Sequence, residues 1–221
     1  MKTLIYSTLP ILLVLFCCNS KSHPGACNTN YEQIKQNKEK DSILVGIIPI
    51  EFSDSSTIDL ITHEIEKFYY VKTNILIGTS LPELAYYPPR QRYRADSLLH
   101  YLETIKPNIM NYLIGLTDRD ISCTSGEHED WGIFGYGTMP GPTCIVSGFR
   151  LTKNCTVNSE FFKQRIFKVV LHELGHNFGL DHCSTKGCLM KDAEGTIKTV
   201  DNERIWICDY CQIKLRKLFP E

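Results

Sequence analysis

The sequence predicts a single α/β domain with a mixed sheet, and three observations support this fold class. Strand-like and helix-like stretches alternate in the order β-α-β-α-β-β-β-α. The 221 residues, 43% of them apolar, are enough for one substantial core and too few for two. No internal repeat or low-complexity tract is visible. The formal net charge of −1 gives no reason to expect nucleic acid as a partner, and we expect a monomer.

Hydrophobic periodicity places the individual elements. Helical spacing of apolar residues predicts helices over residues 58–68 and 95–102, separated by a strand and a Pro-rich loop at 81–90. Residues 118–131 are expected to be irregular. Continuous apolar runs predict strands over residues 43–48, 74–77, 112–116, 132–136 and 144–146.

A further helix is expected to begin near Asn158, a residue type that caps helix N-termini well. One side of this helix is apolar through Phe162, Ile166 and Val170, and a second side becomes apolar towards Leu174. A helix that is apolar on two sides belongs in the middle of the protein, where it makes a rigid support for a site.

The end of this helix carries the most specific motif of the chain, His172-Glu173-Leu174-Gly175-His176-Asn177-Phe178-Gly179-Leu180-Asp181-His182. His172 and His176 are one turn apart, so both imidazoles can reach one metal ion. Gly179 lets the chain leave the helix and return His182 as a third ligand. Three neutral nitrogens leave one tetrahedral position open, as in catalytic rather than structural zinc sites. The alternative, a buried helix that carries histidines by chance, requires five residues in eleven to coincide.

Four cysteines follow the motif in two pairs. Cys183 and Cys188 precede Met190 in a Cys-x4-Cys-x-Met pattern, and Cys208 and Cys211 form a later Cys-x-x-Cys. Two such pairs separated by a loop are what a four-thiolate zinc site needs. The histidine motif joined to these two cysteine patterns resembles the archaemetzincins, zinc-peptidase-like proteins of the metzincin group. The resemblance extends from about Ile43 to the C-terminus.

This resemblance implies a metzincin-like twisted mixed sheet with a backing helix and an active-site helix, followed by a small Cys-rich, zinc-binding C-terminal subdomain. It implies a catalytic zinc held by the three histidines, with Glu173 as the general base. The four cysteines would hold a second, structural zinc, and Met190 would form the methionine turn beneath the catalytic metal. The substrate-side edge strand would consist of Gly132, Ile133, Phe134 and Gly135.

The implied function is zinc-dependent hydrolysis of peptide bonds in a peptide or protein substrate. One alternative is a non-catalytic, zinc-containing binding lipoprotein of the same fold, although a purely structural zinc has no use for Glu173. Another is a disulfide-stapled surface module whose histidines bind metal loosely. His128, in an acidic loop near the expected edge strand, is expected to be solvated, with a position in the cleft as the alternative.

The redox state of the cysteines is left open by the sequence. In an oxidising compartment, disulfides within the pairs Cys183–Cys188 or Cys208–Cys211 could replace the second zinc, although the spacing favours zinc. The pairing of the cysteines outside this pattern does not follow from the sequence; they are Cys27, Cys123, Cys144 and Cys155.

The N-terminus has the pattern of an export signal. Lys2 precedes an apolar stretch over residues 4–16 that is too short for an ordinary membrane span. Cys18 is expected to be lipidated as in bacterial lipoproteins, since cleavage before Cys17 would place the bulky Phe16 at the cut. A simple cleaved signal or a short uncleaved anchor is the alternative. We therefore expect an exported, membrane-anchored protein with a signal peptide (1–17), a flexible tether (18–41) and a catalytic domain (42–221).

Overall fold

The computed structural model describes residues 43–218 of the chain. The expected signal peptide, the lipidation site Cys18, the tether and Cys27 lie outside the described residues. Within the described part, no helix has both the length and the apolar character needed to cross a membrane.

The α/β fold with a mixed sheet is confirmed. Four parallel strands and one antiparallel edge strand form a five-stranded sheet in the order β2-β1-β5-β9-β8. These strands are β1 (Leu44–Pro49), β2 (Lys72–Ile75), β5 (Tyr112–Thr117), β8 (Gly135–Gly137) and β9 (Thr143–Ser147). A smaller four-stranded sheet has the order β3-β4-β6-β7, with β3 (Tyr86–Tyr87), β4 (Arg92–Arg94), β6 (Ile121–Ser125) and β7 (His128–Ile133).

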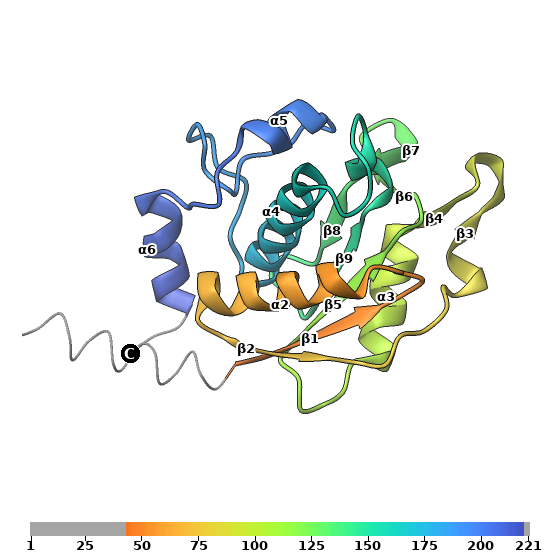
Figure 1. The fold of residues 1–221 in the computed structure, drawn as a ribbon, viewed down its shortest axis with the longest axis horizontal. Coiled ribbons are helices and arrows are strands. Elements are labelled where there is room, and N and C mark those ends of the chain that lie inside the picture. The colour runs from red at the N-terminus through yellow and green to blue at the C-terminus, as the bar shows by residue number, and fades with distance from the viewer. Residues whose placement is uncertain (1–42, 219–221) are drawn as a thin grey trace, which may run out of the picture.

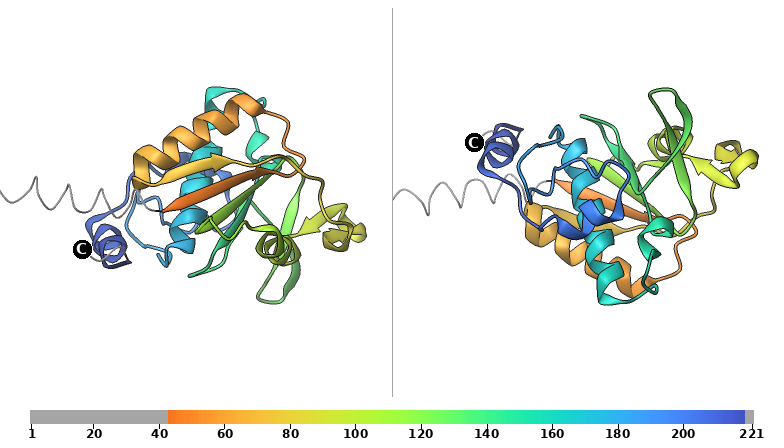
Figure 2. Two further views of the ribbon diagram at one scale, coloured as in Figure 1. Left: turned by 90° about the horizontal axis from the view of Figure 1, so that it is seen from below. Right: turned by 90° about the horizontal axis from the view of Figure 1, so that it is seen from above.

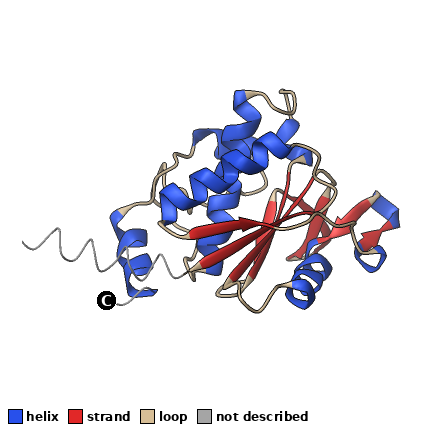
Figure 3. Cartoon of the chain, turned by 60° about the horizontal axis from the view of Figure 1, so that its bottom comes forward, coloured by secondary structure: helices blue, strands red, loops and turns tan. Residues whose placement is uncertain are grey.

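Helices cover both faces of the five-stranded sheet (Figures 1 and 3). On one face lie α2 (Ser55–Tyr69) and α4 (Glu160–Asn177), and on the other lies α3 (Ala95–Ile105). The side chains of β1 point alternately to the two faces of the sheet. Val45 and Ile47 join the core under α2 and α4, whereas Ile48 joins the core under α3. Short 3₁₀ helices occur at Glu83–Ala85, Pro88–Arg90 and Phe149–Thr152.

The C-terminal part packs beside α4 rather than on the sheet. It contains the short helix α5 (Ile197–Asn202) and α6 (Asp209–Leu218), with α6 at one end of the molecule (Figures 1 and 2). Arg165 of α4 is buried and joins α4 to α5, since its guanidinium donates two hydrogen bonds to the Asp201 carboxylate at 2.7 and 2.9 Å. This C-terminal segment and α4 therefore form one packed unit.

Residues 118–131 are not irregular, contrary to the sequence-based expectation, because they contain β6 and most of β7. The strands have only short apolar alternations, which meet as the cross-strand pairs Ile121–Ile133 and Cys123–Trp131, and ion pairs add to these contacts. Asp120 accepts hydrogen bonds from Arg150 at 2.6 and 2.9 Å, and Arg92 lies 3.2 Å from Asp120 and 3.3 Å from Asp130. The two arginines come from distant parts of the chain, and the local alternation spans only two residues in each strand, which is too short to predict the hairpin from periodicity. The Pro-rich loop likewise contains β3.

Two boundaries also differ from expectation. The expected strand over 132–136 is divided between the two sheets, since Gly132 and Ile133 end β7 whereas Gly135 begins β8, with Phe134 between them. The cap of α4 is Ser159 instead of Asn158, and the Ser159 hydroxyl accepts a hydrogen bond from the Phe162 backbone N–H at 3.2 Å.

Candidate active site and metal centres

Helix α4 holds His172 and His176 on one face, and Gly179 turns the chain back towards them. Gly179 has φ = 86°, a left-handed conformation that agrees with the expected exit from the helix. Its N–H donates to the His176 carbonyl at 2.8 Å, and the Leu180 N–H donates to the Gly175 carbonyl at 2.9 Å. This turn brings His182 beside the two helical histidines.

The three histidines form one compact cluster. The Nε2 atoms of His172 and His176 are 3.0 Å apart, and one nitrogen from each of the three rings lies within 4.8 Å of the others. Zinc–nitrogen bonds of about 2.0–2.1 Å would place tetrahedral ligands about 3.3 Å apart, which is close to the observed separation.

Each histidine also has an oxygen atom near its other ring nitrogen. Nδ1 of His172 lies 2.7 Å from the Leu189 carbonyl, and Nδ1 of His176 lies 2.7 Å from the Leu180 carbonyl. Nδ1 of His182 lies 3.5 Å from the Asp192 carboxylate. A proton on Nδ1 leaves a lone pair on Nε2, which is the tautomer that a metal ligand needs. Burial lowers the pKa of His172 to about 3 and also lowers that of His176, so both rings are neutral near pH 7. The cluster therefore fits a zinc ion.

Glu173 lies beside this cluster and is almost fully buried. Burial raises the pKa of its carboxyl group to about 8. The carboxylate faces β8, where Gly135 leaves space for it. A Cβ atom on Gly135 would lie 2.7 Å from Glu173 Oε1, and one on Gly137 would lie 3.0 Å from the Glu173 carbonyl oxygen. The close approach of α4 to the edge strand thus depends on residues without side chains.

Strand β8 is the edge of the five-stranded sheet nearest to Glu173. It pairs with β9 on one side, and no other described strand pairs with its second side. Of the four residues expected to form the edge strand, only Gly135 belongs to it, and Phe134 precedes it. Phe134 still contributes through its carbonyl, which accepts a hydrogen bond from the Ser147 N–H at 2.8 Å.

Met190 is fully buried against α4, between the turns that carry His172 and His176. A Cβ atom on Gly175 would lie 2.6 Å from the Met190 sulfur, so the side chain occupies the space that this glycine provides. The Met190 carbonyl accepts a hydrogen bond from the Cys183 N–H at 2.7 Å. Met190 thereby links the histidine cluster to the cysteines that follow.

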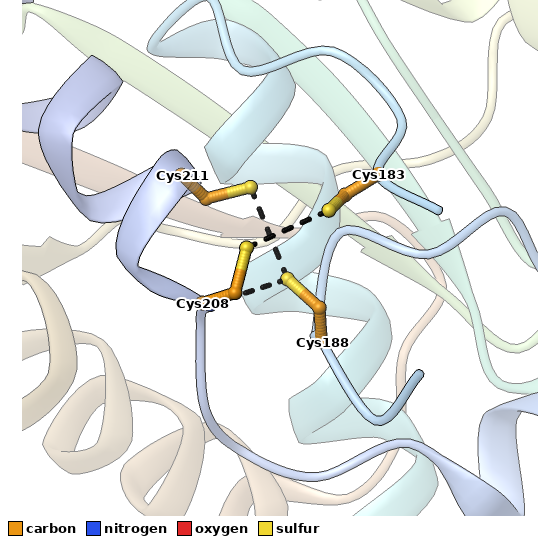
Figure 4. A group of neighbouring side chains, drawn as sticks. All are labelled: Cys183, Cys188, Cys208 and Cys211. Carbon is orange, nitrogen blue, oxygen red and sulfur yellow. Dashed lines mark hydrogen bonds between the residues drawn. The ribbon is translucent and has the colours of Figure 1, made fainter. Parts of the chain in front are cut away.

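The four cysteines of the two pairs converge in a second cluster (Figure 4). The sulfurs of Cys183 and Cys208 are 3.6 Å apart, and those of Cys188 and Cys211 are 3.9 Å apart. Zinc–sulfur bonds of about 2.3 Å would place tetrahedral sulfurs about 3.8 Å apart, whereas a disulfide requires about 2.05 Å. All four are buried free thiols in the described structure, so the cluster fits zinc.

One of the four thiols is already acidic without a metal, whereas burial raises the pKa values of Cys188 and Cys211. Burial would raise the pKa of Cys208, but hydrogen bonds from the Cys211 backbone, Thr185 and the neighbouring thiols lower it to about 6. A thiolate is the form that binds zinc. Cys123, Cys144 and Cys155 are also free thiols and form no disulfide within the described residues.

The histidine cluster opens into a cleft of about 520 Å³. One wall comes from β7, β8 and the segment between them, and the other from α4 and the residues that follow Met190. His128 is exposed, as expected, and lies in β7, where its ring is tilted by 31° to that of Trp131 with ring centroids 5.3 Å apart.

Several contributors to the site were not found from the sequence. The carbonyls of Leu180 and Leu189 hold histidine rings through backbone atoms, which leave no sequence signal. Asp192 was visible only as a charged residue after Met190. The role of Gly137 follows from the approach of α4 to β8, which is a tertiary contact.

Comparison with known proteins identifies relatives of the chain. A family model described as peptidase family M54 matches residues 64–217. The archaemetzincin of Methanopyrus kandleri is 32% identical over 137 residues, which cover 62% of this chain and 73% of the relative. The archaemetzincin of Archaeoglobus fulgidus is 28% identical over 163 residues, which cover 74% of this chain and 93% of the relative.

Solved structures agree with these matches. The crystal structure of the Methanopyrus kandleri archaemetzincin superimposes with a TM-score of 0.69 at 26% identity, covering 80% of this chain and 96% of that chain. The Archaeoglobus fulgidus archaemetzincin, complexed with malonate, has a TM-score of 0.66 at 26% identity, with coverages of 78% and 99%.

Proposed function

The chain belongs to peptidase family M54, the archaemetzincins, and is a zinc metallopeptidase of that family; from this premise we propose which of its residues carry out peptide-bond hydrolysis. His172, His176 and His182 would hold the catalytic zinc, and Glu173 would be the general base. The observation that supports this proposal most is the meeting of three imidazoles with one buried carboxyl group.

Zinc at the three histidines would supply a Lewis acid that polarises the scissile carbonyl and lowers the pKa of a water molecule towards about 7. Glu173 would take a proton from the attacking water on its carboxylate and then give that proton to the leaving amine. A carboxyl group with a pKa near the working pH both accepts and returns a proton readily, and burial raises the pKa of Glu173 into this range.

The substrate would lie extended along β8. The second side of this strand offers backbone groups, and the two glycines keep side chains out of the space between the strand and Glu173. Addition of a peptide strand to an exposed sheet edge supplies main-chain hydrogen bonds without demanding a particular sequence. The backbone at the scissile bond would therefore be held beside Glu173.

Cys183, Cys188, Cys208 and Cys211 would hold a second, structural zinc. Four protein ligands leave no open position, which separates this site from the histidine cluster. The sulfur separations and the absence of disulfides among these residues support the assignment.

The test is Glu173→Gln, which keeps the shape of the side chain and removes the base. We expect cleavage of a diverse peptide library to fall by a factor of about 10² to 10⁴, while the zinc content measured by atomic absorption is unchanged. Glu160→Gln is the matched control, because Glu160 is an exposed carboxylate in the first turn of the same helix.

Undiminished cleavage by the Glu173→Gln protein would refute the role of Glu173. A parent protein that holds zinc and binds peptides without cleaving them would instead support the non-catalytic alternative of the same fold.

The proposal includes a location outside the cytoplasm. The basic residue, apolar stretch and cysteine at the start of the sequence support export and lipidation at Cys18, with the tether joining the anchor to a monomeric catalytic domain.

A further inference from the structure

Trp131 and Gly195 bring the two walls of the active-site cleft into contact. Trp131 lies on β7 in the wall that includes β8, and Gly195 lies in the loop Lys191–Thr196 of the opposite wall. A Cβ atom on Gly195 would lie 3.0 Å from the Cζ2 atom of Trp131 and 3.4 Å from two further indole atoms. The edge of the indole ring therefore rests on the backbone of the opposite wall.

This contact lies at the outer rim of the cleft. Trp131 is 40% exposed and Gly195 is exposed, so neither belongs to the protein core. Both line the same cleft as His172, Glu173 and His176. The contact consequently joins the two walls on the solvent-exposed side of the cleft that leads to the histidine cluster.

The contact is held by packing alone. Among the described residues, no hydrogen bond or ion pair joins β7 to the loop Lys191–Thr196. The loop is instead supported by its own bonds, from the Glu194 N–H to Asp192 at 2.8 Å and from the Thr196 N–H to the Ala193 carbonyl at 2.9 Å. The two walls can thus separate without leaving a polar group unpaired.

The loop also adjoins a histidine of the site, since Asp192 lies 3.5 Å from Nδ1 of His182. The indole in turn contacts the tilted ring of His128 on its own strand. A displacement of the loop away from Trp131 would therefore occur next to the metal centre, while the indole would stay supported by β7.

We propose that Trp131 and the loop Lys191–Thr196 form a clasp across the cleft, and that this clasp restricts cleavage to flexible, extended peptide segments. Such a segment passes between the separated walls and lies along β8, with the indole packed against it. A loop on a folded protein cannot reach β8, because the rest of that protein collides with the clasp. This inference rests on the proposed peptidase function and names its substrate class.

The first measurement uses tryptophan fluorescence, because Trp131 and Trp206 are the only two tryptophans of the chain. The full chain carrying Trp206→Phe and Glu173→Gln, loaded with zinc, has one tryptophan and lacks the proposed base. The probe is a tryptophan-free globular protein, either native or reduced and alkylated. We expect the unfolded probe to shift the emission of Trp131 and to protect it from quenching by acrylamide, and the native probe to do neither.

The second measurement compares the cleavage of the two probes by Trp131→Ala and by the parent. We expect the preference in kcat/KM for the unfolded probe to fall by a factor of at least about 10, the lower end of the discrimination that steric fit supplies. Trp206→Ala is the matched control, since Trp206 is also 40% exposed but does not line the cleft. The Trp206→Ala protein should show the same preference in kcat/KM for the unfolded probe as the parent.

The outcomes separate the clasp from the peptidase proposal. A shift in Trp131 emission without cleavage by the parent supports the clasp and contradicts hydrolysis. Cleavage by the parent with no shift in emission, or with an unchanged preference in Trp131→Ala, overturns the clasp and leaves hydrolysis intact. The absence of both a shift and cleavage overturns both.

Discussion

At the scale of single residues, the position of Glu173 depends on the absence of a side chain at Gly135. Gly135 provides the space that the carboxylate occupies, and a Cβ atom there would come within 2.7 Å of Oε1. Real Cβ atoms do not approach oxygen so closely, so Glu173 or β8 would have to move. Catalysis that relies on a positioned base is sensitive to displacements of about 1 Å.

We therefore expect Gly135→Ala to lower kcat by about 10²-fold while the zinc content is unchanged. The measurement is steady-state cleavage of a peptide, with zinc determined on the same sample. In a Glu173→Gln background the substitution should cause no further loss of rate, because the group that it displaces is already inactive. An independent, additive loss would show that Gly135 acts on something other than Glu173.

The same carboxyl group makes the stability of the metal-free protein depend on pH. Burial raises the pKa of Glu173 from its ordinary value of 4.5 to about 8, so between these pH values the unfolded chain releases the proton that the folded chain retains. The free energy of unfolding therefore falls as pH rises from about 4.5 to 8. A tenfold difference in proton affinity between the two states is equivalent to about 1.4 kcal/mol, so the whole fall is on the order of 5 kcal/mol.

Glu173→Gln should remove this pH-dependent fall in the free energy of unfolding. We expect the Tm of the chelator-treated variant to exceed that of the parent by a margin that grows between pH 5 and pH 8, measured by scanning calorimetry. His172, whose pKa burial lowers to about 3, destabilises both proteins below pH 6.5 and cancels in the comparison. Parallel curves for the two proteins would contradict the assigned effect.

At the scale of secondary-structure elements, the cysteine cluster connects α6 to the segment of Met190 beneath the histidine cluster. Cys211 belongs to α6, and Cys183 donates its N–H to the Met190 carbonyl at 2.7 Å. The Leu189 N–H donates to the Trp206 carbonyl at 2.7 Å, so the segment before α6 also contacts the methionine turn. Loss of the cluster would release both segments from α4.

Cys211→Ser should remove one zinc ion per chain and leave the other in place. We expect the Tm to fall by roughly 5–10 °C, the effect of losing a metal site from a domain of this size. Zinc counting and calorimetry on the purified protein measure both effects. Cys155→Ser is the control, because Cys155 is a free thiol outside the cluster and its replacement should leave the zinc content unchanged. Two zinc ions in the Cys211→Ser protein would exclude a four-thiolate site.

At the scale of the whole molecule, we expect the proposed anchor and the catalytic domain to be separable. The described fold begins with β1 at Leu44 and contains both clusters. A chain that starts at residue 42 should therefore bind zinc and cleave peptides like the full chain, because no described residue of the site precedes this point.

The anchor itself is tested by Cys18→Ala in cells fed with labelled palmitate. We expect the substitution to abolish labelling and to move the protein out of the membrane fraction. Cys17→Ala is the matched control and should remain labelled, because only Cys18 is expected to follow the cleavage point. Labelling of Cys18→Ala would contradict the assignment.

Local patterns in the sequence were sufficient for the parts of the fold that local physics controls. The buried strands β1 and β5 appear as apolar runs, and α2, α3 and α4 as apolar residues at helical spacing. The spacing of the histidines and of the cysteines also indicated which side chains would meet, since ligands one turn apart or in short pairs converge wherever their segment lies. The sequence alone thus determined the fold class and both candidate ligand sets.

Tertiary structure alone decided the surroundings of these ligands. The ion pairs beside the β6–β7 hairpin come from Arg92 and Arg150 in distant segments, and the apolar alternation within the hairpin is limited to two residues in each strand. The carbonyls that hold the histidine rings, the glycines that admit Glu173 and the contact of Trp131 with Gly195 likewise depend on how closely two remote backbones approach. That distance is set by the packing of the whole core, and no short stretch of sequence encodes it.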